Sequence, residues 1–316
     1  AFNEEEVLSA FHERLIAVLD GLPSDFEILY VNDGSRDATL EILEKIRKQT
    51  PQAAIIDLSR NFGKEAAMTA GFDLAKGDAV VVIDADLQDP PELIQDFFKA
   101  WNDEGFDVVY ARRRTRSGES WLKRTTATAF YWTMSKLSQV EIPRDTGDFR
   151  LMSRRAVESL KQLREQHRFM KGLFAWVGYP AKEILYDRDP RFKGVTKWNY
   201  LKLWNFSLEG ITGFTIAPLK VATYLGLVIS AVAAVYGIII ILQTLIQGSD
   251  VPGYPSLMSV ILFLGGVQLF FLGLIGEYLG RVFNESKRRP GVRNRGDLAT
   301  RLLKREQKEW LAPRLP

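Results

Sequence analysis

Two aspartates separated by one residue, Asp84 and Asp86, follow directly after an apolar run, Val80–Ile83. In a locally extended segment, residues two apart point to the same side. Mg²⁺ and Mn²⁺ prefer oxygen ligands, and Mg²⁺ is typically held by one or two carboxylates together with substrate phosphates. The pattern therefore predicts a divalent-cation site for a nucleotide diphosphate. The alternative is an N-cap cluster for a helix that begins at Pro91.

A second polar cluster, Asn32–Ser35, places a carboxylate in a glycine turn after another apolar run. We expect Asp33 to contact the base or ribose of a nucleotide, with a structural Asx turn as the alternative. Asp37 is expected to cap the helix that follows.

Two other classes of nucleotide-binding protein are disfavoured. The segment that ends in Gly63-Lys64 is no Walker P-loop, because Leu58 stands where its first glycine should be and Glu65 replaces the Ser/Thr. No G-x-G-x-x-G occurs, which weakens a dinucleotide-dependent oxidoreductase.

The elements that must position these residues alternate between strand and helix. Four short apolar runs have the composition of strands buried on both faces of a parallel sheet: Phe26–Val31, Ala54–Leu58, Ala79–Ile83 and Val108–Ala111. Helical patterns lie before and between them: Glu4–Leu22, Ala38–Gln49, Lys64–Ala75 and Pro91–Trp101. This order predicts an α/β fold with a Rossmann-like doubly wound, mostly parallel sheet, whose ligands bind at the carboxyl ends of the strands.

The start of the chain is expected to lead straight into the first helix. Asn3 is its expected N-cap, and three glutamates would occupy the first turn, where the helix dipole favours acids. The opening Ala-Phe-Asn-Glu enters at the loop where a strand should have ended. We therefore expect a first strand of the sheet to precede Ala1.

Two uncharged apolar runs, Val221–Ile246 and Leu257–Gly276, hold 26 and 20 residues. About 20 apolar residues span a hydrocarbon core as a helix. We expect two transmembrane helices, at about 221–246 and 257–280, within a C-terminal region of residues 215–283.

The charges around these runs predict their orientation. The connector Gln247–Ser256 has no Lys or Arg, whereas basic residues flank the two runs on their other sides. Positively charged flanks of membrane spans stay on the cytoplasmic side. We therefore expect a protein of the inner (plasma) membrane whose catalytic domain and tail, residues 284–316, lie in the cytoplasm. The absence of cysteine suits a reducing cytoplasm.

The middle of the chain and its tail carry signs of a membrane surface. Residues 121–137 combine aromatic and cationic side chains on one helix, which favours the interface plane, with a core helix as the alternative. A second interfacial helix is expected at residues 199–214. The basic tail suits anionic headgroups or a solvated helix, and nucleic acid is disfavoured because no binding motif accompanies the charge.

Five motifs occur in order along the chain: Asn3-Glu4, Asn32-Asp33-Gly34-Ser35, Arg60-Asn61-Phe62-Gly63-Lys64, Asp84-Ala85-Asp86-Leu87-Gln88 and Gly147-Asp148-Phe149-Arg150-Leu151. Together they resemble the family 2 GT-A glycosyltransferases that act on polyprenyl phosphates. The two apolar runs add to the likeness with the bacterial bactoprenol glucosyltransferase branch, which is related to dolichyl-phosphate mannose synthase. The resemblance covers residues 1 to about 290.

This resemblance implies inverting transfer of a sugar from a nucleotide diphosphate to a polyprenyl phosphate, with Mg²⁺ or Mn²⁺ as cofactor. Glucose from UDP-glucose and undecaprenyl phosphate are the expected substrates, and GDP-mannose is the alternative donor. A phosphate monoester has a second pKa near 6 and is largely a dianion at neutral pH, so it needs little help from a general base. It needs in-line placement and cations that offset repulsion between two phosphate groups.

The resemblance also implies residue roles. The expected metal ligands are Asp84, Asp86 and Gln88, with Asp84 also near the ribose. Asp148 is expected beside the reacting sugar, as an orienting group or a base, and Asp86 is the second catalytic residue. The expected donor-binding residues are Asn3, Glu4, Asp33, Arg60, Lys64 and Asp84.

Basic residues of the middle segment are expected to bind the acceptor phosphate. Arg124 and Thr128, four apart, would share a helix face. The full expected set is Arg112, Arg124, Thr128, Arg191 and Lys197. The chain would then divide into a donor-binding half, residues 1–111, and an acceptor-binding half, residues 112–214.

Other functions and the oligomeric state stay open. A processive polysaccharide synthase normally needs more spans and a Q-x-x-R-W motif, and two spans are few for a flippase. A membrane-anchored nucleotide-sugar sensor without turnover is the alternative from another class. Small residues in the second apolar run, such as Gly265 and Gly266, would let helices approach closely, so a homo-oligomer is expected.

Overall fold

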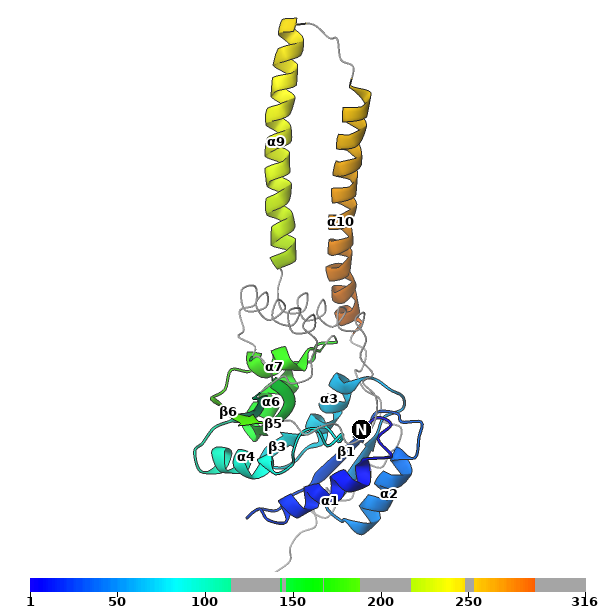
Figure 1. The fold of residues 1–316 in the computed structure, drawn as a ribbon, viewed down its shortest axis with the longest axis vertical. Helices are drawn as coiled ribbons and strands as arrows, with labels where there is room; N and C mark the ends of the chain where they lie inside the picture. The colour runs from blue at the N-terminus through cyan, green and yellow to red at the C-terminus, as the bar shows by residue number, and fades with distance from the viewer. Residues whose placement is uncertain (115–142, 144–145, 167, 188–216, 248–252, 288–316) are drawn as a thin grey trace, which may run out of the picture.

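A computed structural model describes residues 1–114, 143, 146–166, 168–187, 217–247 and 253–287 of the 316-residue chain. An α/β domain lies at one end, and two long helices extend from it (Figure 1). The described elements are, in chain order, α1 (Leu8–Leu19), β1 (Ile28–Asn32), α2 (Thr39–Gln49), β2 (Ala53–Asp57), α3 (Lys64–Leu74), β3 (Ala79–Val82), α4 (Leu93–Asn102), β4 (Val108–Arg113), β5 (Thr146–Ser153), α6 (Arg154–Gln162), α7 (Met170–Trp176), β6 (Ala181–Tyr186), α9 (Ala217–Gln247) and α10 (Tyr254–Ser286).

The described strands form two sheets. β1 and β2 pair in parallel, with Ile28 opposite Ala53, and β3, β5, β4 and β6 form a second sheet in that order. β5 runs antiparallel to both β3 and β4, whereas β4 and β6 are parallel. The prediction of a mostly parallel sheet is therefore wrong for the described residues: the fold is a mixed α/β one.

The strand β5 accounts for this difference. Phe149 and Leu151 are buried in the larger core with α1 and α4, while Met152 belongs to a second cluster formed with α6 and α7. A strand with apolar residues on both faces is stable only with cover on both sides. It therefore lies in the middle of the sheet, where the antiparallel direction brings the segment after Gly147 back between β3 and β4.

The first helix begins later than predicted. α1 starts at Leu8 without a side-chain cap, and its first turn holds no acid. Asn3 is not its N-cap but has a left-handed φ of 54°. Its amide donates to the Ser35 hydroxyl at 3.0 Å, and its Oδ1 accepts from the Arg36 amide at 3.0 Å. The residues before α1 thus form a loop that is held by the β1–α2 loop.

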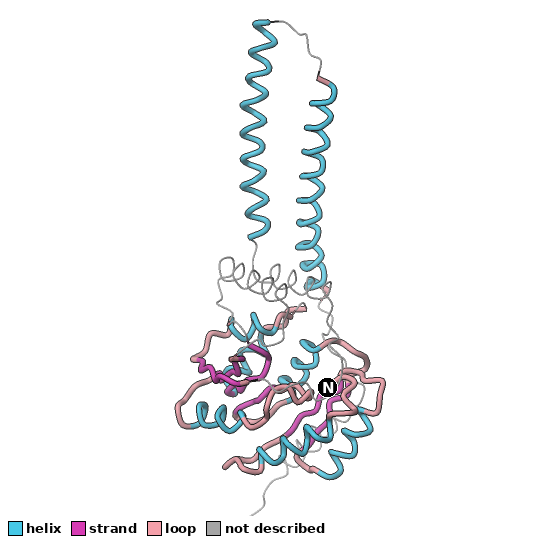
Figure 2. The backbone as a smooth tube through the Cα atoms, viewed as in Figure 1, coloured by secondary structure: helices cyan, strands magenta, loops and turns pink. Residues whose placement is uncertain are grey.

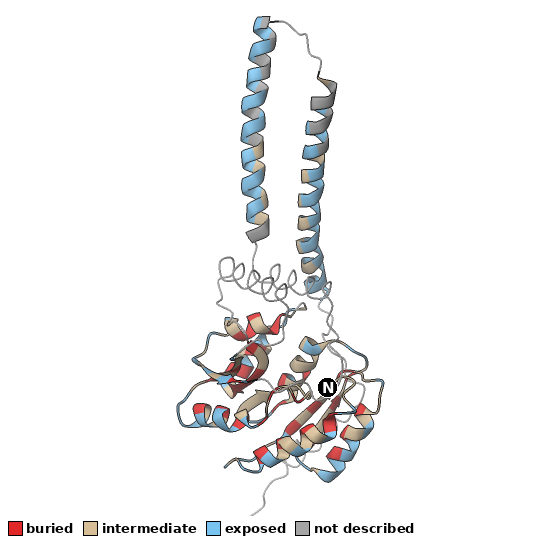
Figure 3. Cartoon of the chain, viewed as in Figure 1, coloured by how far each residue is buried: buried red, intermediate tan, exposed pale blue. Residues whose placement is uncertain are grey.

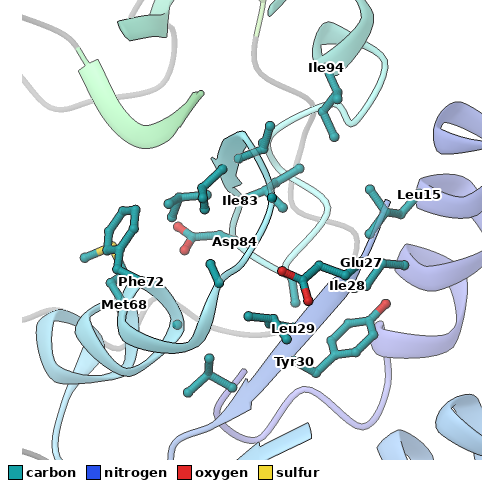
Figure 4. Close-up of a pocket in the computed structure, with 18 of the residues that line it drawn as sticks. Leu15, Glu27, Ile28, Leu29, Tyr30, Met68, Phe72, Ile83, Asp84 and Ile94 are labelled. Carbon is teal, nitrogen blue, oxygen red and sulfur yellow. The ribbon is translucent and has the colours of Figure 1, made fainter. Parts of the chain in front are cut away.

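A cavity of about 900 Å³ lies between β1 and β3 (Figure 4). Apolar residues of α1, α3 and both strands line most of it, including Leu15, Leu29 and Phe72. At one end, the Ala1 ammonium donates to the Val31 carbonyl at 2.7 Å, and the Ala1 carbonyl accepts from the Asp33 amide at 2.9 Å. Two such bonds on either side of one residue are the pattern of neighbouring parallel strands. The expected strand before Ala1 stays a prediction.

The two long helices differ from the α/β domain in what they expose. Figure 2 shows that helices and strands combine in the α/β domain, whereas α9 and α10 are helices alone. Buried residues concentrate in that domain, while the described side chains of α9 and α10 are mostly exposed (Figure 3). Leu227, Leu245 and Phe270 are 69%, 78% and 70% exposed. Apolar surface of this extent on two helices is unusual in a water-soluble monomer.

The predicted spans fall within α9 and α10. Among the described residues, one segment, Phe263–Ser286, is long and apolar enough to cross a membrane, and Leu219–Ala233 is a shorter apolar stretch. The expected interfacial helices at 121–137 and 199–214, and nearly all of the tail, lie outside the described residues.

Candidate active site

Four of the predicted donor-binding residues line the cavity, together with the predicted metal ligand Asp86: Glu4, Asp33, Lys64 and Asp84. Asp33 directly follows β1, and the two other aspartates follow β3. Lys64 opens α3 after Gly63, whose φ of 96° turns the chain into the helix. The predicted clustering of these residues is therefore observed, and Figure 4 shows Asp84 at this cavity.

Lys64 joins two carboxylates that are far apart in the sequence. Its Nζ lies 2.6 Å from Asp84 Oδ2 and 2.7 Å from Asp148 Oδ2. Partial burial would lower the pKa of the Lys64 ammonium, but Asp148 and Asp84 raise it. Lys64 is therefore positively charged and links the end of β3 to β5.

Asp148 is the more enclosed of the two carboxylates that pair with Lys64, since its side chain is 11% exposed and that of Asp84 is 38% exposed. Burial raises the pKa of its carboxyl, but Lys64, Lys171 and Arg150 outweigh burial and hold the pKa below its ordinary value. Its Oδ1 has no hydrogen-bond partner among the described residues. A carboxylate held ionised in this way is a weak proton acceptor, which favours an orienting role for Asp148 over that of a general base.

Two cations beside Asp148 had no assigned role in the sequence analysis. Arg150 lies two residues further along β5, donates to the Gly147 carbonyl at 3.0 Å and stacks over the Phe174 ring at 3.7 Å. Lys171 comes from α7, distant in sequence. The sequence does offer a signal for Arg150, because it follows Asp148 by two residues and would therefore lie on the same face of a strand. Nothing in the sequence pointed to Lys171.

Glu65 is a further titratable group in this cluster. Its Oε2 accepts from the Met170 amide at 3.2 Å, which ties α3 to the start of α7. Burial, with the nearby charge of Asp148, raises the pKa of Glu65 to about 8. Glu65 therefore carries a proton at neutral pH and adds no negative charge to the site.

Asp33 holds the loop that precedes Lys64. Its Oδ1 accepts from the Phe62 amide at 2.7 Å and its Oδ2 from the Gly63 amide at 2.9 Å. This structural role accounts for its burial, and the predicted contact with a base or ribose stays a prediction. Arg60, in the same loop, is exposed and lies over the Phe62 ring at 4.3 Å.

The turn after β3 has the oxygen donors predicted for a metal. Asp86 Oδ1 accepts from the Gln88 amide at 3.1 Å, and Leu87 between them has a left-handed φ of 57°. A strained backbone of this kind is found preferentially at functional sites. No cluster of three or more His, Asp or Glu that could bind a metal occurs in the described part of the chain. Two carboxylates and an amide fit Mg²⁺ or Mn²⁺ when phosphate oxygens complete the shell.

Of the predicted acceptor-binding residues, the described part of the chain includes Arg112. Arg112 forms an ion pair with Glu183 at 2.9 Å on β6. The next residue, Arg113, donates to the Tyr186 hydroxyl at 3.3 Å and comes near Gly147. Arg113 therefore lies beside the start of β5, the strand that carries Asp148. The remaining members lie outside the described residues: Arg124, Thr128, Arg191 and Lys197.

Comparison with known proteins shows which protein family this chain belongs to. Residues 1–161 match the model of glycosyl transferase family 2, and residues 217–282 match the GtrB C-terminal hairpin. The chain belongs to glycosyl transferase family 2. The family 2 match covers α1 through nearly all of α6 and so includes Asp84 and Asp148, while the hairpin match covers α9 and most of α10. The predicted resemblance is confirmed.

Family 2 relatives match along nearly the whole chain. A glycosyltransferase of Synechocystis sp. is 56% identical over 92% of this chain and 91% of its own length. The bactoprenol glucosyl transferase of Shigella phage SfV is 47% identical over 92% of this chain and 94% of its own length. A prophage bactoprenol glucosyl transferase homolog of Escherichia coli K12 is 46% identical over 92% and 94%. Among solved structures, mannosyl-3-phosphoglycerate synthase from Rubrobacter xylanophilus is 19% identical, with a TM-score of 0.45 over 66% of this chain and 68% of that chain.

Proposed function

We propose that the protein transfers a sugar from a nucleotide diphosphate to a polyprenyl phosphate at the cytoplasmic face of a membrane. The observation that carries this proposal is a charged site at Asp84, Lys64 and Asp148 in a chain that continues into two long apolar helices. Relatives named bactoprenol glucosyl transferase, 46% and 47% identical to this chain, support the lipid acceptor.

The proposed reaction forms one bond and breaks one. An oxygen of the acceptor phosphate attacks C1 of the sugar, the bond from C1 to the diphosphate breaks, and the nucleoside diphosphate leaves with inversion at C1. The acceptor is largely a dianion at neutral pH, so no residue has to remove a proton. Asp148 orients the sugar through its unpartnered Oδ1. Lys64 offsets the charge that develops on the leaving diphosphate.

A divalent cation fits the turn after β3. Asp84, Asp86 and Gln88 would hold it together with the diphosphate, and Asp84 Oδ2 would then be shared with Lys64. Bound there, Mg²⁺ or Mn²⁺ stabilises negative charge on the departing diphosphate.

UDP-glucose is the proposed donor and undecaprenyl phosphate the proposed acceptor, on the strength of the relatives' printed names. GDP-mannose, as in a dolichyl-phosphate-mannose-type synthase, is the alternative donor. Donor identity is tested by comparing nucleotide sugars for their effect on thermal unfolding in Mn²⁺, followed by turnover.

The membrane placement is proposed from charge and length. α9 and α10 would both span the inner membrane, with the catalytic domain and the tail in the cytoplasm. A homo-oligomer is also proposed. A Cβ added at Gly265, Gly266 or Gly273 of α10 would meet no atom within 4 Å, so this part of the helix is open to a neighbouring helix.

The decisive experiment is a transfer assay on the full chain in lipid nanodiscs. Radiolabelled UDP-glucose, Mn²⁺ and undecaprenyl phosphate should give a lipid-linked sugar, and EDTA should abolish it. If the protein binds a nucleotide sugar but makes no lipid-linked product with UDP-glucose or GDP-mannose, the alternative of a sensor without turnover is favoured.

A further inference from the structure

Lys171 is a partly buried cation with no ion pair or hydrogen bond of its side chain among the described residues. It lies in the first turn of α7, which Glu65 and Phe174 hold in place. Glu65 accepts from the Met170 amide, and the Phe174 ring stacks under Arg150. An ammonium that is partly withdrawn from water and forms no ion pair would be stabilised by an anionic ligand.

The charges around Lys171 point to an anion. Three described cations act on Asp148: Lys64, Lys171 and Arg150. The described carboxylates that pair with Lys64 are Asp148 and Asp84, and Glu65 carries a proton at neutral pH. Among these described groups, positive charge exceeds negative charge, and a phosphate monoester dianion would offset the excess.

The position of α7 separates this subsite from the donor turn. The segment before α7 reaches the end of α10, where the Gln166 amide donates to Glu285 Oε1 at 2.6 Å. α7 therefore lies on the side of the α/β domain from which the long helices extend (Figure 1). A phosphate whose lipid chain stays in the bilayer would enter from this side, whereas Asp84 and Asp86 lie at the cavity between β1 and β3.

We propose that Lys171 binds the phosphate of the lipid acceptor and positions its attacking oxygen beside Asp148. This inference rests on the proposed function and adds a residue to it. Lys171 would neutralise one charge of the dianion and hold it near the sugar that Asp148 orients. Burial and the neighbouring cations lower the pKa of the Lys171 ammonium, and a bound dianion would raise it again.

The test uses the full chain in nanodiscs and three variants. Lys171→Met removes the charge and keeps most of the length of the side chain, and Lys171→Arg keeps the charge. Lys161→Met is the matched control, because Lys161 lies on neighbouring α6 and pairs with Glu158 at the surface at 2.9 Å. Thermal unfolding establishes that each variant is folded before its kinetics are compared.

Kinetics and calorimetry then distinguish an effect on acceptor binding from an effect on donor binding. At saturating UDP-glucose, Lys171→Met should lower kcat/KM for undecaprenyl phosphate at least tenfold, while Lys171→Arg recovers most of it and Lys161→Met matches the wild type. Calorimetric binding of farnesyl phosphate, which needs no turnover, should weaken at least tenfold in Lys171→Met. Binding of UDP-glucose should change less than twofold.

Two results would overturn the inference. One is weaker UDP-glucose binding with unchanged farnesyl phosphate binding, which would place Lys171 at the donor diphosphate. The other is unchanged binding of both ligands, which would make Lys171 a purely structural cation. Failure of the proposed function is a different result, since it would appear as absence of transfer in the wild type, and the binding arm would still decide the role of Lys171.

Discussion

At the scale of single residues, the charge state of the site follows from neighbours and burial acting against each other. Asp148 is ionised because three cations outweigh its burial. Glu65, which follows Lys64 in the sequence, is protonated because its burial outweighs the effect of the nearby cations. Two carboxyl groups in one cluster thus have opposite charge states at neutral pH. Their roles differ accordingly: Asp148 accepts hydrogen bonds, and Glu65 supports α7.

The proposed metal ligand Asp86 gives the first residue-scale prediction. Asp86→Asn should lower transfer at least tenfold, which corresponds to about 1.4 kcal/mol of transition-state stabilisation, because the amide binds a divalent cation more weakly. Initial rates over a Mn²⁺ titration would measure this. Asp96→Asn, at an exposed position on α4, is the control, and near-normal turnover by Asp86→Asn in low Mn²⁺ would contradict the assignment.

The raised pKa of Glu65 gives the second. Its pKa is about 8 in the folded protein against an ordinary value of 4.5, so the folded state binds a proton that the unfolded state has lost. The free energy of unfolding should therefore fall between about pH 5 and pH 8, by at most about 1.4 kcal/mol per pH unit. Glu65→Gln keeps an acceptor for the Met170 amide but cannot ionise, so its thermal midpoint should fall less over this range. Equal pH slopes for the two proteins would show that Glu65 ionises normally.

At the scale of elements, loops from different strands are held so closely that side-chain size matters. The turn after β1 approaches the loop before α3, and Asp33 bonds two amides of that loop. A Cβ built on Gly34 would lie 2.4 Å from the Arg60 carbonyl carbon and 2.6 Å from the Asn61 nitrogen. The glycine is therefore required by a backbone neighbour as well as by its φ of 65°.

Gly34→Ala should accordingly destabilise the domain and weaken nucleotide-sugar binding, since the loop that leads into Lys64 must move. Gly105→Ala is the matched control, because Gly105 has a similar φ of 77° but no atom within 4 Å of its added Cβ. Both variants bear the conformational strain, of about 1 kcal/mol or more. Only Gly34→Ala should also lose affinity for UDP-glucose in calorimetry, and equal affinities would show that the close approach has no role in donor binding.

At the scale of the whole molecule, two apolar helices extend from the α/β domain. The helix α7, which carries Lys171, lies on the side of the domain that faces these two helices. α9 has 31 residues and α10 has 33, and at about 1.5 Å per residue each exceeds the thickness of a hydrocarbon core. An acceptor with a lipid chain and a phosphate would then meet the site without leaving the bilayer.

Cysteine labelling tests this topology, because the chain contains no cysteine. A cysteine at Ser249, in the connector, should react with an impermeant thiol reagent added to intact cells. A cysteine at the exposed Ser24 of the α/β domain should react only after the cells are lysed. The reverse pattern would place the catalytic domain outside the cytoplasm.

The sequence predicted most local structure because local structure depends on short-range patterns. The apolar runs up to Val108, the helices between them and the aspartates after β1 and β3 were all placed within a few residues. Errors occurred where distant segments decide the outcome. α1 begins at Leu8 because the loop around Asn3 bonds to Ser35 and Arg36, which local propensity does not reveal.

What the sequence by itself determined is the family, the position of the aspartates after β3 and the apolar helices, since each depends on contiguous residues. The tertiary structure alone decided the antiparallel course of β5, the link from Asp84 through Lys64 to Asp148 and the arrival of Lys171 from α7. These features join residues as far apart as Lys64 and Lys171. Ion pairs and buried charges depend on distance in space, which chain order does not set, so only the folded protein shows where the cations of this site gather.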